Sequence, residues 1–87
     1  MGLDSLEIIL SVEEMFEISV PDESAAQLYT VGELHGFIVQ ELERMQRPNV
    51  HPEIVFDQLR TIICFQLGVP PEQVLASAHF IRDLGLN

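Results

Sequence analysis

The sequence predicts an all-α fold, a small four-helix bundle with three longer helices and one short helix. Apolar residues recur at helical spacing in three separate stretches, and no stretch alternates in the manner of a β-strand. Signals for helix starts and helix ends separate these stretches. The chain has 87 residues, which suffice for one domain with a modest core.

The first helix is expected from Leu3 to Glu17, and it carries two apolar faces. One is a core stripe of Ile8, Ile9, Val12, Met15 and Phe16. The opposite arc mixes Leu3, Leu6 and Leu10 with Glu7, Glu13, Glu14 and Glu17. Leucines surrounded by carboxylates indicate a surface for a partner that is basic with an apolar centre. The alternative is that this second face packs on another helix of the same bundle.

Two helices are expected next in the chain. Pro21 ends the extended segment after the first helix, and Asp22 is a candidate N-cap of a short helix that runs to Leu28. Thr30 and Glu33 have the spacing of a capping box. The helix behind them should end near Gln46 and present one apolar side, formed by Leu34, Phe37, Ile38, Leu42 and Met45.

The last long helix should follow a linker over 47–52, with Pro52 at its first position and Gly68 as its C-terminal cap. Its apolar face is formed by Val55, Leu59, Ile62 and Ile63, with Phe56 and Leu67 at the edge. A long loop over 69–78 follows, with one helical turn expected over 72–75. Three apolar anchors come after it: Phe80, Ile81 and Leu84.

The formal net charge is −10, and it is uneven along the chain. Residues 1–47 hold ten acidic residues against two arginines, whereas residues 48–87 hold four against two. Such a chain is repelled by phosphate backbones, which disfavours nucleic-acid binding and favours a basic protein partner. The alternative is that acidity only keeps a small domain soluble.

The composition also bears on location and chemistry. No apolar run reaches the length of a membrane span, no signal-peptide pattern is present, and Cys64 is the single cysteine, so we expect a reducing, cytoplasmic compartment. The histidines at 35, 51 and 79 lack metal-ligand spacing, so no metal site is expected. Nothing in the sequence indicates intrinsic catalysis, and the chain is not expected to be an enzyme.

Several motifs resemble the acyl carrier protein family, but in a different order. Residues 16–26, FEISVPDESAA, and 30–34, TVGEL, resemble the end of that family's second helix and the starts of its third and fourth. Residues 59–63, LRTII, 66–69, QLGV, and 83–85, DLG, resemble its beginning. Residues 1–46 thus resemble helices II–IV, 47–52 a linker, and 53–87 helix I with its following loop.

This order implies a circularly permuted single domain over 1–87, with Gly2 and Asn87 close together in a closed monomer. The alternative is a domain-swapped dimer, in which the second half joins a neighbouring molecule's bundle.

The resemblance implies a prosthetic group. Acyl carrier proteins bear 4′-phosphopantetheine on a serine in a Gly-x-Asp-Ser-Leu motif, and residues 2–6, GLDSL, match that motif with Ser5 flanked by Asp4 and Leu6. A phosphodiester suits a helix start. In the alternative register, aligned on Phe16 without a gap, Gly2 takes the serine position and Asn87 that of the aspartate. The helical wheel also turns Ser5 towards the core.

The resemblance therefore implies a protein that carries acyl groups in fatty acid or polyketide biosynthesis. Its partners would be the basic surfaces of acyl-processing enzymes and a phosphopantetheinyl transferase, docked on Leu6, Glu7, Leu10, Glu13 and Glu14. The alternative is a carrier-derived acidic interaction module without a prosthetic group.

Overall fold

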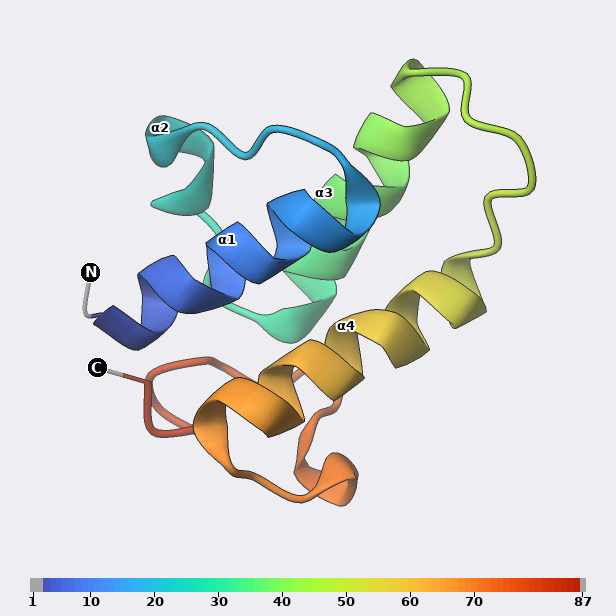
Figure 1. Ribbon diagram of the computed structural model, residues 1–87. Helices are drawn as coiled ribbons and strands as arrows, with labels where there is room; N and C mark the ends of the chain where they lie inside the picture. The colour runs from blue at the N-terminus through green and yellow to red at the C-terminus, as the bar shows by residue number, and fades with distance from the viewer. Residues whose placement is uncertain (1–2, 87) are drawn as a thin grey trace.

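The computed structural model describes residues 3–86, and the side chains from Ser5 onwards. Within this range the chain forms four α-helices and one short 3₁₀ turn, and the predicted all-α class is confirmed (Figure 1). The elements are α1 (Leu3–Phe16), α2 (Asp22–Ala25), α3 (Val31–Arg44), α4 (Pro52–Leu67) and η1 (Pro71–Gln73). No strand forms between residues 3 and 86, where β-type pairing is limited to a single antiparallel bridge between Thr30 and His79.

Helix α4 packs against both α1 and α3, so the two halves of the chain contribute to one hydrophobic core (Figure 1). Its most deeply buried side chains are Val12, Val31, Leu34, Ile38, Leu59, Ile63 and Val74. Three positions predicted as apolar core or anchors are wrong, because Met15, Met45 and Ile81 are exposed. Met15 is the last residue but one of α1, and Met45 follows the last residue of α3, so both lie at helix ends rather than in the middle of the packed faces.

Most helix boundaries follow the local signals in the sequence. The Thr30–Glu33 capping box is present, Pro52 opens α4, and Gly68 closes it with φ of 68°. The expected cap at Asp22 is wrong: Pro21 occupies the cap position and Asp22 is the first helical residue. That short helix ends at Ala25 rather than Leu28, and the turn after α4 lies over Pro71–Gln73 rather than 72–75.

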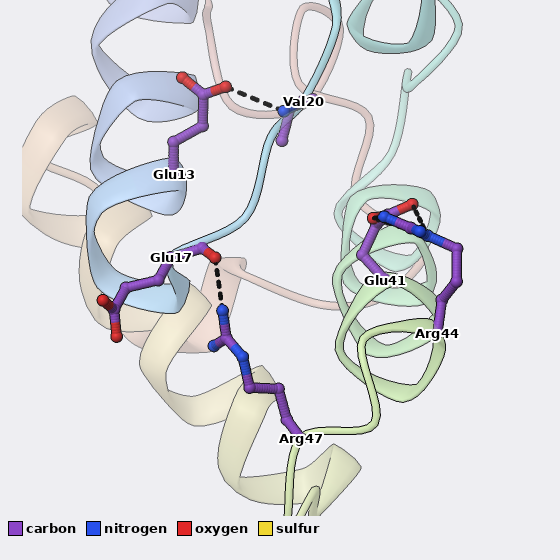
Figure 2. A network of polar contacts seen from close by, with 6 residues as sticks. All are labelled: Glu13, Glu17, Val20, Glu41, Arg44 and Arg47. Carbon is purple, nitrogen blue, oxygen red and sulfur yellow. Dashed lines mark hydrogen bonds and ion pairs between the residues drawn. The ribbon is translucent and has the colours of Figure 1, made fainter.

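The segment between α3 and α4 is fastened to the end of α1 by Arg47. Its guanidinium donates hydrogen bonds to the carbonyl of Phe16, at 2.8 Å, and to that of Glu17, at 2.6 Å, the second of which is drawn in Figure 2. The last carbonyls of a helix have no partner within the helix and carry partial negative charge, so an arginine stabilises them on both counts. Residues thirty positions apart are thereby held together at the C-terminal end of α1.

The C-terminal segment lies along the start of α3. The amides of Val31 and Gly32 donate to the carbonyls of Ala78 (3.0 Å) and Ala76 (2.8 Å), and Phe80 donates to Tyr29 (2.9 Å). A Cβ on Gly32 would stand 2.8 Å from the Ala76 carbonyl oxygen, so only glycine permits this approach.

The expectation that Gly2 and Asn87 lie close together falls outside the described residues. Their described neighbours, the start of α1 and the C-terminal segment, lie at the same end of the bundle (Figure 1).

Candidate functional site

Ser5 is the third residue of α1, and its side chain is turned into the protein. Only 8% of the residue is exposed. The helical wheel predicted this orientation, because Ser5 shares an arc with Val12 and Phe16. The side chain of Asp4 and the whole of Gly2, the other motif positions, lie outside the part of the chain that is described. Leu6, the residue after the serine, points to the surface.

Ser5 lines a mainly apolar cavity of about 110 Å³ between α1, the α2–α3 connection and the C-terminal segment. From α1 it is lined by Ser5, Ile8 and Ile9, and from residues 25–34 by Ala25, Ala26, Leu28, Tyr29 and Leu34. The C-terminal segment closes it with His79, Phe80, Ile81 and Leu86. The sequence offered no local signal for this last wall, because these residues lie about 75 positions from Ser5 in the chain.

Two carboxylates hold the backbone segments that form the cavity wall. Glu33 accepts the amides of Tyr29 and Thr30, each at 3.0 Å, and these donors hold the pKa of its carboxyl below the ordinary value. Asp83 accepts the amide of His79 at 2.7 Å, and that bond is the main cause of a lowered pKa for Asp83. Both carboxylates are exposed. They accept hydrogen bonds from backbone amides that would otherwise have to be satisfied by water.

His79 holds the turn that carries the cavity-lining residues Phe80 and Ile81. Its Nδ1 atom lies 3.2 Å from the amide nitrogens of Ile81 and Arg82, so it accepts from both. That role assigns the proton of a neutral ring to Nε2. Tyr29 stacks on the same ring, with centroids 6.0 Å apart. His79 is therefore a structural residue of the cavity wall.

The predicted partner-binding side chains lie on one face of α1. Leu6 and Leu10 are each 49% exposed, and Glu7 and Glu14 are exposed beside them. The alternative, in which this face packs on another helix of the chain, is wrong for Leu10, because half of that residue is exposed. Among residues 5–86, neither Glu7 nor Glu14 makes a side-chain hydrogen bond, so both carboxylates are open to solvent.

Glu13 differs from the other glutamates of this face. It is half-buried, and its Oε2 accepts the amide of Val20 at 2.9 Å, which folds the segment after α1 back along the helix (Figure 2). Its carboxylate therefore has a structural contact that the sequence did not reveal.

The remaining candidate groups do not gather into a site. Among the described residues no group of three or more His, Cys, Asp and Glu side chains has the arrangement to hold a metal ion. The Nε2 atom of His35 lies 2.8 Å from the Pro52 carbonyl, and its ring meets the edge of Phe56. Cys64 is half-buried in α4. In the described range no helix has the length and apolar character needed to cross a bilayer.

Known proteins match part of this chain. An acyl carrier protein of Phenylobacterium zucineum is 40% identical over 41 residues, which is 47% of this chain and 52% of that protein. One from Caulobacter vibrioides is 38% identical over 40 residues, 46% of this chain and 51% of its own length. The chain thus spans about half the length of the curated relatives it matches. No family model matches, and no solved structure matches.

Proposed function

We propose that this chain is an acyl-carrier-like protein that presents α1 to acyl-processing enzymes. The observation that carries the proposal is the exposed face of α1, where Leu6 and Leu10 stand among Glu7 and Glu14. Half-exposed leucines supply apolar contact at the centre of an interface, and surrounding carboxylates steer a basic partner towards it. The partial similarity to proteins named acyl carrier protein supports this reading.

The cavity beside Ser5 supports a role with acyl chains. It is lined mainly by aliphatic and aromatic side chains, as small-molecule pockets are. Its volume of about 110 Å³ suits a short segment of alkyl chain. One wall rests on three backbone hydrogen bonds between residues 29–32 and residues 76–80, so we expect it to open more readily than a long helix would.

The group implied by this function is 4′-phosphopantetheine, whose thiol would carry the acyl chain. The candidate attachment residue is Ser5, with Asp4 and Leu6 beside it. A charged phosphodiester does not fit Ser5 as the structure places it, because the residue is 8% exposed and faces an apolar cavity. Loading at Ser5 therefore requires the first turn of α1 to open.

The burial of Ser5 favours a second candidate function. In it the chain is a carrier-derived interaction module, without a prosthetic group, that keeps the acidic face of α1. The two candidates share the docking face and differ only at Ser5.

We further propose that the chain is one permuted domain in which the segments run II, III, IV, I. In this arrangement α4, which resembles the family's first helix, packs on α1 and α3 of the same chain. The six-residue linker 47–52 makes that connection, and Arg47 holds it against the end of α1. Ser5 and Leu86 line one cavity, so the described ends of the chain lie near each other, which supports this arrangement.

Intact mass measured after incubation with coenzyme A and a broad-specificity phosphopantetheinyl transferase separates the two candidates. The carrier reading predicts a gain of one phosphopantetheinyl group, absent in Ser5→Ala and retained in Ser11→Ala, the matched serine of the same helix. No gain in the wild-type chain, with transferase binding intact, identifies the module instead. Absence of both loading and binding would remove the whole proposal.

A further inference from the structure

A second exposed surface runs along α4, and it differs from the acidic face of α1. Ile54, Gln58, Thr61 and Phe65 recur at helical spacing, so they form one stripe on the outside of the helix. All four are exposed, and Phe65, at 84%, has the largest exposed fraction among the described large apolar side chains. An isolated exposed apolar residue is ordinary, whereas two on one uncharged stripe indicate a contact surface.

Met15 of α1 joins this stripe from the side. It is 48% exposed and lines two neighbouring hollows, one with Ile54 and Gln58 and the other with Thr61 and Phe65. Each hollow is also lined by one charged side chain: Glu14 in one, and Arg47 in the other, where the guanidinium is engaged with the carbonyls at the end of α1. We call the stripe and Met15 together the neutral face.

We propose that the neutral face binds a second copy of this chain, with the two α4 helices antiparallel about a twofold axis. The register follows from the positions in the stripe. An axis midway between Gln58 and Thr61 brings each Phe65 over the Ile54 of the other copy and each Gln58 over the other Thr61. Apolar residues then meet apolar ones, polar uncharged side chains meet at the centre, and the surface complements itself as an isologous contact requires.

The distribution of charge supports a second copy over another occupant. Each chain carries a net charge of −10, so two copies repel unless they meet where acidic side chains are few. The four stripe residues are uncharged, and the neighbouring Asp57 is already paired with Arg60, so two copies can approach here with less repulsion than at the acidic face of α1. Added salt screens the remaining repulsion, so self-association should strengthen with salt.

The test is sedimentation equilibrium of the full chain at low and high salt. We expect a weak dimer, with Kd of roughly 10–1000 μM, because the patch is small beside stable interfaces. The Kd should fall at least threefold as salt rises and should increase at least tenfold in Phe65→Ser. Leu75→Ser, at an apolar residue 57% exposed outside α4, is the matched control and should leave the Kd unchanged. Unfolding midpoints of both variants confirm that the fold is kept.

Disulfide trapping tests the register separately. In a Cys64→Ser background, Gln58→Cys mixed with Thr61→Cys should form the mixed disulfide in several-fold excess over either homodisulfide. A monomer at every concentration and salt overturns the proposal, as does a dimer that Phe65→Ser leaves intact, which would include a domain-swapped one. Homodisulfides in excess would overturn the antiparallel arrangement. The proposal is independent of cofactor loading and stands or falls without it.

Discussion

The two exposed flanks of α1 present apolar side chains of nearly equal exposure in different electrostatic surroundings. Leu10 is 49% exposed on one flank and Met15 is 48% exposed on the other. Leu10 stands among open carboxylates, whereas Met15 borders the uncharged stripe of α4. Exposure alone would rank the two surfaces as equivalent, whereas the surrounding charge is the basis on which we propose different partners: a basic protein for the acidic flank and a second copy for the neutral one.

The largest expected effect comes from removing the packing that supports both flanks. Phe16 lies in the shared core, so Phe16→Ala should lower the free energy of unfolding by about 3–5 kcal/mol. Small domains have only ~5–15 kcal/mol in total, so urea denaturation should show a much earlier midpoint or no folded baseline. A loss below ~1 kcal/mol would contradict the shared core.

Truncating the two apolar side chains should then separate the flanks. Leu10→Ala should weaken binding to a phosphopantetheinyl transferase by about tenfold or more, chiefly through faster dissociation, because it removes contact at the centre of the patch. Met15→Ala should leave this binding within twofold and weaken self-association instead. Surface plasmon resonance and sedimentation equilibrium measure the two effects, and equal losses in both assays would erase the distinction.

Reversing the open carboxylates should act in opposite directions on the two surfaces. Glu7→Lys with Glu14→Lys should slow association with the transferase several-fold at low salt and flatten its salt dependence, because these charges act on encounter. The same double variant should strengthen self-association, since it lowers the net charge of each copy. Stopped-flow rates between ~20 and ~500 mM salt provide the measurement. An unchanged association rate would leave the acidic flank without a docking role.

Local signals predicted the helices of this chain well, for a physical reason. The Thr30–Glu33 box, Pro52 and Gly68 act on backbone groups within four residues, so their sequence spacing contains the whole interaction. The core stripe of Ile8, Val12 and Phe16 follows equally from helical periodicity.

Interactions between distant residues could not be predicted in this way. Nothing in the sequence joins Arg47 to the carbonyl of Phe16, or places Leu86 beside Ser5, because such pairs depend on how complete helices pack. Met15 was predicted as buried because helical periodicity gives a face but not the extent to which a neighbour covers it, and Ile81 was predicted as an anchor from its apolar character alone. The orientation of Ser5 was predicted, whereas the cavity in front of it was not.

Substitutions at Glu13 and Glu14 test whether the glutamates of the acidic flank differ in role, with Glu13 stabilising the fold and Glu14 acting in docking. Glu13→Ala should lower the free energy of unfolding by about 0.5–1.5 kcal/mol, because it leaves the Val20 amide without its acceptor. Glu14→Ala should change stability by no more than ~0.5 kcal/mol and act on docking alone. Thermal unfolding of the two variants beside wild type gives the comparison. Equal stability changes would show that the Glu13 contact contributes nothing to the fold.

The smallest expected effect is a pH-dependent change in stability. It distinguishes carboxylates that stabilise the fold from those that face a partner. Backbone donors lower the pKa of Glu33, so its ionised form is favoured in the folded state. The stability it contributes is complete above the ordinary glutamate pKa of ~4.3 and disappears as pH falls through the lower folded value. Glu33→Gln should therefore reduce the urea midpoint at pH ~7 but much less at pH ~3, where the wild-type carboxyl is also being neutralised. Glu43→Gln, on the exposed side of the same helix, is the control and should not show this convergence. If Glu33→Gln lowered the urea midpoint by the same amount at both pH values, the loss of stability would come from the shape of the side chain rather than from its charge.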